Sequence, residues 1–455
     1  MRNRNILIIA YYYPPKGGAG VQRTAKFAKY LSKYGFDVHV LTVKEDKKGL
    51  IDESLKIDIK DDIKVYRTDI DEPNFIDKLV NISNKNIMDK SSEKAIVKSS
   101  DDNNKFFYKF KKNLRNFAKK IFLDIYNLIY VPDDKKGWIK YAVPEAKKII
   151  KENNIELIYT TSSPYTTHMI GYELANEMDV KWIADFRDPW ASNPFVSYSY
   201  VIQKIYNRME YKVVNKADMV ISVSKPIIDD FIIRYPKMNP EKFVKITNGY
   251  DEEDFKNLDL SMGDNNECFT ILYNGTMYGK ETPNNLFSAI DNLLSGNKID
   301  KNKFKIKFVG NIGHSQMDVL EEYKEKYPKN IERMEYITHK ESLKELCKAN
   351  ALLLIVDDEP GNEGIYTGKI FEYIRTGKDI LAIVPDGVAK DLIIETNTGY
   401  IASPLSVDEI EKIIFKAYEN FFDKKKEIVP NYDKVKNYSR ENLALQLISY
   451  INKFF

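Results

Sequence analysis

Residues 5–35 read NILIIAYYYPPKGGAGVQRTAKFAKYLSKYG, and this one stretch contains the pattern that decides the fold. Its apolar first part predicts a buried strand, and its second part has the spacing of an amphipathic helix that ends at Gly35. Gly17, Gly18 and Gly20 lie in the loop between them. Open α/β sheets bind ligands where their parallel strands end, and glycines let a diphosphate approach the backbone there. The stretch predicts a parallel sheet with a ligand loop, although a tight structural connection would use the same residues.

The same alternation of short β-branched runs with helical patterns continues along the chain. The clearest runs are FDVHVLTV, IKVYRTD, IELIYTTS, KWIADF, MVISVS, FTILYNG, FKIKFVG, ALLLIVD and DILAIVP. This alternation predicts two doubly wound, Rossmann-like α/β domains with parallel sheets. A polar stretch near 248–266 separates them, so we expect an N-terminal domain over 1–248 and a C-terminal domain over 249–430. Residues 431–455 predict one last amphipathic helix.

The composition excludes several classes of protein. Of the 455 residues, 43% are hydrophobic and 30% are charged, as in a globular protein, and the net charge of +3 gives nucleic-acid binding no support. Two cysteines, Cys268 and Cys347, cannot build a disulfide framework, and no Cys/His cluster suggests a metal site. No run reaches the roughly 18 apolar residues of a membrane span, and the N-terminal apolar run is too short for a signal peptide. We therefore expect a cytoplasmic protein.

Residues 72–135 interrupt the alternation and predict an insertion in the N-terminal domain. Between residues 105 and 120 there are seven Lys or Arg and no acidic residue, while Phe106 and Phe110 begin an apolar stripe at helical spacing. A cationic amphipathic helix of this kind could lie on an anionic membrane surface. It could equally pack its apolar stripe on the domain and turn its lysines to water. Membrane contact through 105–130 is therefore one of two open interpretations.

A second informative stretch, IYTGKIFEYIRTGK at 365–378, predicts a helix that begins near Thr367 and ends at Gly377. The start of a helix offers unpaired N–H groups and the positive end of the macrodipole, and Lys369 adds a full charge beside them. Together these features make a plausible anion site. Glu372 shares a helix face with Lys369 and could accept hydrogen bonds from a sugar diol. The residues alone also fit an ordinary surface helix with a Thr cap and a Lys–Glu pair.

The stretch DFRDPW supplies the sharpest polar group of the N-terminal half. Asp185, Arg187 and Asp188 follow a buried strand at its carboxyl end, which is the ligand edge of a parallel sheet. A carboxylate at Asp188 could orient or deprotonate an acceptor hydroxyl, and Arg187 could bind an anionic acceptor group. Asp185 and Arg187 could instead form an internal salt bridge. Trp190 could be a platform for the acceptor or part of the packing.

Taken in order, these segments resemble the family 4 glycosyltransferases of the GT-B fold, and in particular the bacterial members that assemble cell-surface polysaccharides. The resemblance is carried by AYYYPPKGGAGVQRTAKFAKYLSKYGFDVHVLT, YTTSSPYTTHMIGYELANEMDVKWIADFRDPW, ADMVISVSKPIIDDF, ITNGYD, ILYNGTMYGK and YTGKIFEYIRTGKDILAIV. It covers nearly the whole chain apart from about 72–130. It implies two Rossmann-like domains that face each other across a cleft, with the helix in 431–455 returning to the N-terminal domain. The C-terminal domain would hold a nucleotide-sugar donor and the N-terminal domain the acceptor.

The resemblance also implies roles for individual residues. Thr367, Gly368 and Lys369 would contact the donor diphosphate, and Glu372 would hold the ribose. Further donor contacts would come from Gly275 with Lys280, from Gly18, Gly20 and Arg23 in the other domain, and from Gly310 and the YITHKESL loop beside the base. Asp188, Asp185, Arg187 and His168 would serve the acceptor and the chemistry. Arg23 could also simply remain solvated.

Three positions depart from the pattern common in the family. Where many relatives have the first of two Glu residues eight positions apart, this chain has Gly364, with Glu363 beside it. Thr276 stands where many relatives have an Arg. The strand that ends IYTTSSP lacks the His of several relatives and has Ser162 near that position. His168 could partly replace this His, or could be an ordinary residue at a helix start.

The resemblance implies transfer of a sugar with retention of the anomeric configuration, through front-face attack in which the leaving diphosphate helps to accept the proton. The protein would then supply positioning and charge stabilisation, with no metal or other cofactor. We expect a UDP-sugar as donor, a saccharide or polyprenyl-diphosphate-linked saccharide as acceptor, and action at the inner face of the plasma membrane. Two other classes stay open. One is a nucleotide-sugar epimerase on the same fold, and the other is a catalytically silent nucleotide-sugar-binding scaffold.

Overall fold

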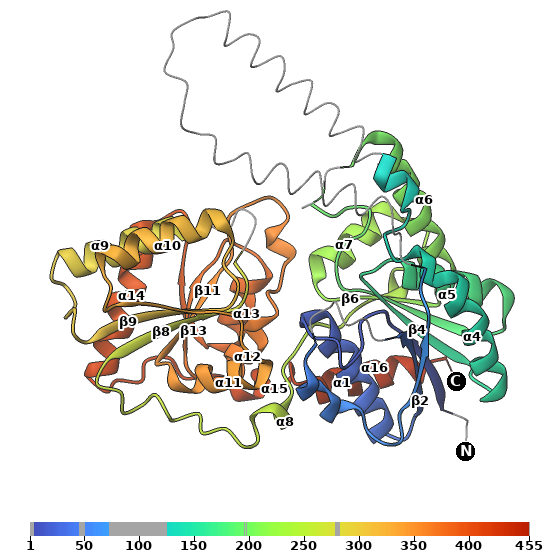
Figure 1. Ribbon diagram of the computed structural model, residues 1–455, viewed down its shortest axis with the longest axis horizontal. Coiled ribbons are helices and arrows are strands. Elements are labelled where there is room, and N and C mark those ends of the chain that lie inside the picture. The colour runs from blue at the N-terminus through green and yellow to red at the C-terminus, as the bar shows by residue number, and fades with distance from the viewer. Residues whose placement is uncertain are drawn as a thin grey trace, which may run out of the picture.

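The chain forms two α/β domains that lie side by side, joined through short helices at their base (Figure 1). The structure is a computed structural model and describes residues 4–44, 51–71, 125–194, 196, 198–277 and 283–454. The basic segment 105–120 lies outside these residues, so its expected helix and membrane contact stay predictions.

The N-terminal domain is built on a parallel sheet with the strand order β3-β2-β1-β4-β5-β6-β7. Its strands are β1 Asn5–Ile9, β2 Asp37–Val43, β3 Lys64–Thr68, β4 Leu157–Ser162, β5 Lys181–Phe186, β6 Met219–Ser222 and β7 Phe243–Lys245. Its helices are α1 Ala19–Lys33, α4 Ile139–Glu152, α5 Thr166–Glu177, α6 Tyr200–Lys216 and α7 Lys225–Arg234, with 3-10 turns at Glu53–Asp58, Lys136–Trp138 and Pro240–Lys242. The strand–glycine loop–helix unit of residues 5–35 is therefore β1 and α1, as predicted.

The C-terminal domain repeats this plan with the strand order β10-β9-β8-β11-β12-β13, also parallel. Its strands are β8 Phe269–Asn274, β9 Phe304–Val309, β10 Ile331–Met334, β11 Ala351–Ile355, β12 Asp379–Ile383 and β13 Gly399–Ala402. Its helices are α9 Asn284–Ser295, α10 His314–Lys326, α11 His339–Lys348, α12 Lys369–Thr376, α13 Val388–Thr396 and α14 Val407–Phe422, with the 3-10 turn η4 at Asn362–Gly364. The predicted pair of doubly wound parallel domains is confirmed.

The central strands of each sheet, such as β1 and β11, are buried along almost their whole length because helices cover both faces of the sheet. Side chains alternate between the two faces of a strand. In β1, Leu7 and Ile9 pack into a core with α4 and α5, while Ile6 and Ile8 pack into a second core with α1. This burial on both faces is why the strands appear in the sequence as continuous apolar runs instead of alternating ones.

The chain crosses between the domains twice, and the two crossings are hydrogen-bonded to each other. The first contains α8 Glu252–Phe255, and the second contains α15 Tyr432–Lys436 and leads into α16 Arg440–Ile451. The Tyr250 N–H donates to the Tyr438 carbonyl at 3.1 Å, and the Arg440 N–H donates to the Tyr250 carbonyl at 2.7 Å. A Cβ at Gly249 would come within 2.1 Å of the Tyr438 carbonyl oxygen, so only glycine fits at this crossing.

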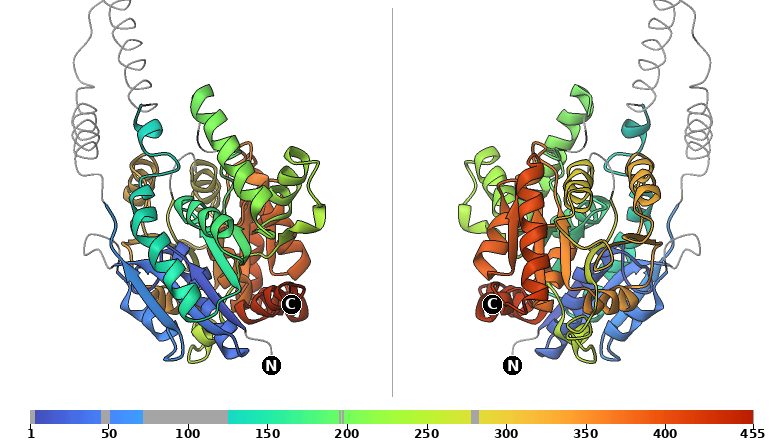
Figure 2. Two further views of the ribbon diagram at one scale, coloured as in Figure 1. Left: turned by 90° about the vertical axis from the view of Figure 1, so that its right-hand side faces the viewer. Right: turned by 90° about the vertical axis from the view of Figure 1, so that its left-hand side faces the viewer.

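The terminal helix α16 packs against the N-terminal domain, as the resemblance implied. Its apolar residues Leu443, Leu447 and Ile451 join the core formed by α1 and the sheet. Figure 2 shows this dark red helix against the blue strands and helix of the N-terminal domain. The return fastens the two domains together with both crossings on the same side.

Candidate active site between the domains

The helix predicted within residues 365–378 is present as α12, with one difference at its start. The helix begins at Lys369 with Gly368 as its N-cap, and the Thr367 side chain makes no capping hydrogen bond. The Thr367 Oγ1 atom is buried and has no hydrogen-bond partner among the described residues. Gly377 ends the helix with φ +71°, the left-handed C-cap that was predicted. Apart from the Ile370 N–H, which donates to the Thr367 carbonyl at 3.2 Å, the missing cap leaves the first N–H groups of the helix and this hydroxyl to a ligand.

Two strand-end glycines converge on the same point. Gly275 follows β8 with φ +145°, and a Cβ there would lie 3.2 Å from the Lys369 Nζ. Gly310 follows β9 with φ +120°, and a Cβ there would lie 2.2 Å from the Gly275 carbonyl oxygen. Lys369 Nζ itself lies 3.6 Å from the centre of the Tyr273 ring. Bare backbone, a helix start and a lysine therefore meet at one edge of the C-terminal sheet. Lys280 falls outside the described residues.

Glu372 lies one helical turn beyond Lys369 and has a histidine as partner. The Glu372 Oε1 atom is 2.8 Å from the Nε2 atom of His339, the first residue of α11. Burial disfavours the charged imidazole, but the Glu372 carboxylate, helped by Asp254, outweighs it and raises the pKa of His339 to about 9. The stretch YITHKESL was expected beside the base, but no role was predicted for His339 within it. The signal was the Thr338-x-x-Glu341 capping box, which places His339 at a helix start.

On the N-terminal side, Arg187 holds the glycine loop instead of pairing with Asp185. Its guanidinium donates to the carbonyls of Ser162, Ser163 and Gly20, the last at 2.8 Å. A Cβ at Gly20 would come within 2.8 Å of this guanidinium, so glycine is needed for the contact. Gly18, by contrast, is exposed with φ +102° and open space around its Cα. Arg187 thus joins the end of β4 to the loop after β1.

Arg23 and Asp185 pair with each other, which corrects both expected roles. The two residues are 1% and 0% exposed, and the Arg23 Nε and Nη2 atoms donate to the carboxylate at 2.8 and 2.9 Å. Arg23 also donates to the carbonyls of Ile246 and Thr247. Burial would raise the pKa of Asp185, but the charge and hydrogen bonds of Arg23 lower it. Both side chains are enclosed and have their hydrogen-bond partners inside the domain, so neither is free to contact a phosphate or an acceptor.

His168 is also enclosed and cannot serve the acceptor in this structure. Its side chain is fully buried, with Nδ1 2.8 Å from the Thr160 Oγ1 and the ring against Phe186. Burial lowers the pKa of His168 to about 3, so the ring is neutral. Ser162, near the position of the missing family His, is buried as well. Of the two interpretations of His168, the structure supports an ordinary buried residue near a helix start.

Asp188 remains as the carboxylate that faces open space. It is exposed at the end of β5, and no hydrogen bond or ion pair to it is found among the described residues. Partial desolvation raises the pKa of the Asp188 carboxyl, although Arg187 opposes the shift. Trp190 is fully buried and stacked on Tyr165 at 4.6 Å between ring centres. Of the two interpretations of Trp190, the structure supports packing.

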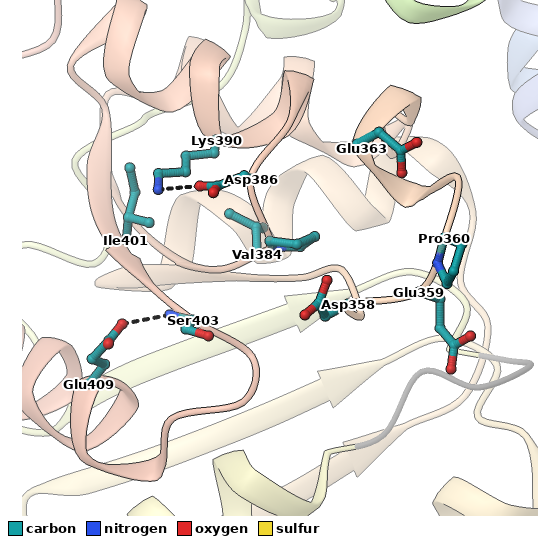
Figure 3. A pocket seen from close by; sticks show the side chains of 11 residues that line it. Asp358, Glu359, Pro360, Glu363, Val384, Asp386, Lys390, Ile401, Ser403 and Glu409 are labelled. Carbon is teal, nitrogen blue, oxygen red and sulfur yellow. Dashed lines mark hydrogen bonds and ion pairs between the residues drawn. The ribbon is translucent and has the colours of Figure 1, made fainter.

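The carboxylate next to Gly364 turns toward its own loop. Glu363 accepts a hydrogen bond from the Gly361 N–H at 2.7 Å. It lines an acidic pocket of about 610 Å³ at the ends of β11, β12 and β13, shown in Figure 3. Asp386 in this pocket is paired with Lys390 at 2.6 Å. The Glu363 carboxylate therefore does not take the place of the Glu that many relatives have where this chain has Gly364.

The described residues contain neither a metal-binding cluster nor a membrane-spanning helix. No group of three or more His, Cys, Asp or Glu side chains in this part of the chain is arranged to hold a metal ion. None of the described helices combines the length and the apolar character needed to cross a bilayer.

Part of the chain matches a known protein family, and nearly the whole chain is similar in fold to solved structures. Residues 108–254 match the model of the family described as Glycosyltransferase Family 4. No curated protein sequence matches the chain. Among solved structures, sucrose-phosphate synthase from Thermosynechococcus elongatus is similar with a TM-score of 0.60 and 14% identity over 99% of both chains. A glycosyltransferase from Rickettsia africae ESF-5 has a TM-score of 0.61 and 14% identity, with 100% of this chain and 99% of that chain covered. The fold is GT-B.

A third similar structure is Anabaena HepE in complex with UDP and glucose, with a TM-score of 0.57 and 14% identity over 98% of this chain and 99% of that chain. The family match agrees with the expectation of a glycosyltransferase, and the similar structures show the fold. In this GT-B frame the anion site of α12 and the loop beside Asp188 belong to the carboxyl edges of the two sheets. The arrangement can hold an anion on one domain and present a carboxylate on the other.

Proposed function

We propose that this protein transfers a sugar from a nucleoside-diphosphate sugar to a saccharide acceptor, with retention of the anomeric configuration. The observation that carries the proposal is the convergence of Gly275, Gly310 and Lys369 at the uncapped start of α12. A diphosphate needs close backbone approach, N–H donors and positive charge, and this point offers all three. Glu372, one turn further, would accept hydrogen bonds from the ribose hydroxyls.

The donor in this proposal is a UDP-sugar. The support is the similarity to Anabaena HepE, whose structure contains UDP and glucose. When the sugar leaves, negative charge develops on the diphosphate, and the helix dipole with Lys369 stabilises it. This device supplies charge stabilisation from the protein itself, so we propose that transfer does not require a metal.

In the proposed chemistry the acceptor hydroxyl attacks the anomeric carbon on the face from which the diphosphate leaves. The bond from that carbon to the diphosphate oxygen breaks, and the hydroxyl proton passes to the departing diphosphate. Asp188 is the N-terminal carboxylate proposed to orient this hydroxyl, because it is exposed and has no competing partner among the described side chains. Arg187 contributes indirectly, by fixing the loop that contains Gly20.

The acceptor is proposed to be a lipid-linked saccharide used in surface polysaccharide synthesis at the inner face of the plasma membrane. Apolar side chains are exposed at one end of the N-terminal domain, in the helical segment 125–129 and at the start of α6, where Figures 1 and 2 place both. They are Ile125 (54% exposed), Leu128 (52%), Tyr200 (73%) and Val201 (58%). Sedimentation with vesicles containing anionic lipid tests this part, and we expect binding that weakens when Leu128 and Val201 are replaced by Ser.

The main experiment is calorimetric titration with UDP, GDP and ADP, followed by turnover with the matching sugar nucleotides. Lys369→Ala should weaken binding of one nucleotide by about 10- to 100-fold, since it removes a charge-assisted contact of roughly 1.5–3 kcal/mol. Lys344→Ala is the matched control, because Lys344 is an exposed lysine on the neighbouring helix α11. Proton NMR of the product reports the anomeric configuration.

Each rival function has its own outcome in this experiment. An epimerase would convert the sugar nucleotide into an isomer without any acceptor. A catalytically silent scaffold would bind the nucleotide but would not convert any sugar nucleotide, with or without an acceptor. Absence of binding by all three nucleotides would refute the proposal.

A further inference from the structure

The carboxylate of Glu372 has a protein partner that lies outside its own motif. The Nε2 atom of His339 is 2.8 Å from Oε1, and the two side chains are 18% and 17% exposed. The position of His339 is fixed by the capping box at the start of α11, in which Thr338 and Glu341 bond each other's backbone. No second partner of the Glu372 carboxylate is found in the described part of the chain, so Oε2 stays available to a ligand.

Three charged side chains, each on a different element, act electrostatically on the imidazole of His339, and one of them, Glu372, contacts it. They are Glu372 on α12, Asp254 on α8 and Lys26 on α1. Burial and Lys26 disfavour the charged ring, but the two carboxylates outweigh them and keep it protonated at neutral pH. An imidazolium donates from both nitrogens and accepts at neither. Its Nε2–H therefore donates to the Glu372 Oε1 atom, and this hydrogen bond holds the carboxylate in one orientation.

Ion pairs connect the surroundings of His339 and Glu372 to α8, the helix in the first crossing between the domains. Asp254 accepts from the Lys26 Nζ at 2.9 Å, and Lys26 also pairs with Asp251 at 2.7 Å. On the other side, Arg375 of α12 pairs with Glu252 of α8 at 2.8 Å. The crossing helix α8 is thus linked both to the helix that contains Glu372 and to the helix that follows the glycine loop. These links restrict how α11, α12 and α8 can move relative to one another.

We propose that His339 is a positioning residue that aims the Glu372 carboxylate at the ribose hydroxyls of the donor. This inference rests on the proposed function, because it takes Glu372 as the ribose contact. Without the imidazolium the Glu372 side chain would lose its fixed rotamer, and the energy gained from the 2′-hydroxyl would fall. His339 would then act on the donor only through Glu372.

The test compares each nucleoside diphosphate with its 2′-deoxy form. Calorimetry measures the affinity for UDP and for 2′-deoxy-UDP, and in the same way for GDP and ADP with their 2′-deoxy forms. The proteins compared are wild type, His339→Ala, Glu372→Ala and the double variant. We expect wild type to prefer the ribose form by about tenfold, as for one hydrogen bond to a charged group. His339→Ala should lose most of this preference, and the double variant should resemble Glu372→Ala. Lys344→Ala, which removes a charge elsewhere on α11, should keep the preference.

A pH series supplies a readout that mere loss of packing would not change. The ratio of wild-type to His339→Gln affinity should be constant between pH 7 and 8 and should fall above pH 9, where the imidazole loses its proton. Taking the ratio at each pH removes any titration of the base or of other side chains.

Three outcomes separate the inference from the proposed function. Loss of the ribose preference in His339→Ala, with a falling ratio, supports the inference. Nucleotide binding in which His339→Ala keeps the full preference overturns the inference and leaves the proposed function standing. Absence of any nucleotide binding by wild type overturns both.

Discussion

Replacing Arg23 by Met should destabilise the N-terminal domain by about 3–5 kcal/mol, the cost of leaving a buried carboxylate without its partner. This loss of unfolding free energy is large for a single substitution, for reasons that the contacts of Asp185 show. Asp185 is 0% exposed and would keep only the Tyr159 and Thr161 hydroxyls as donors, at 2.5 and 3.2 Å. The carbonyls of Ile246 and Thr247 would lose their donor as well. A typical domain is stable by about 5–15 kcal/mol, so this is a large fraction.

Denaturant unfolding followed by tryptophan fluorescence can measure this loss in the N-terminal domain alone. The chain has three tryptophans, Trp138, Trp182 and Trp190, and all of them lie in the core of that domain. Lys147→Met is the matched control. Lys147 pairs with Glu177 on the same domain, but this pair is open to solvent, with the Lys147 side chain 30% exposed and the Glu177 side chain 51% exposed. Breaking that exposed pair should cost no more than about 1 kcal/mol.

The effect of Arg23→Met should depend on pH in a defined direction. In wild type the pKa of Asp185 is lowered by Arg23, so the pair contributes stability above the ordinary Asp pKa and loses it as pH falls through the lowered value. In the variant, burial without Arg23 raises that pKa, so acid protonates Asp185 and relieves the penalty. The difference from wild type should shrink between pH 8 and pH 5. A cost within 1 kcal/mol of the control at both pH values would refute the buried-pair argument.

Three further predictions concern the site and the domain crossing. Gly310→Ala places a Cβ 2.2 Å from the Gly275 carbonyl oxygen at φ +120°, so the thermal unfolding temperature should fall by several degrees and nucleotide affinity should fall with it. Gly368 has φ −56° and open space where a Cβ would lie, so Gly368→Ala should keep wild-type stability and lose only nucleotide affinity. Asp188→Asn should reduce kcat by about 10²-fold, the cost of a misplaced acceptor hydroxyl, measured as nucleotide release, and should leave the donor Kd unchanged; an equal loss in donor binding would contradict its acceptor role. Leu447→Ala should cost about 2–5 kcal/mol in the tryptophan-detected unfolding, because α16 fills the N-terminal core, whereas the exposed Leu445→Ala should be nearly neutral.

Local patterns were sufficient to predict most of the architecture. The run from β1 through the glycine loop to α1, the helix α12 with its Gly377 cap, and the paired parallel sheets all follow from apolar spacing and turn residues. These features are local because a strand or helix is marked by the period of its own side chains. The glycine at 275 could be placed at a strand end for the same reason.

The charged residues were harder to place, and the reason is physical. Arg23 sits on the helix after the glycine loop, where a phosphate contact was expected, yet its partner Asp185 lies 162 residues away. His168 was expected near the cleft, but the fold encloses its ring against Phe186. Whether a charge is free or saturated depends on which side chains meet across the fold, and periodicity does not contain that information.

The sequence by itself determined which elements form and in what order, and the family resemblance implied which glycines and which lysine belong to the donor site. Only the tertiary structure decided which polar side chains remain free to act. Arg187 became a support for the Gly20 loop, Asp188 stayed exposed, and His339 joined Glu372 from a neighbouring helix. The physical reason is that secondary structure depends on neighbours along the chain, whereas desolvation and ion pairing depend on neighbours in space.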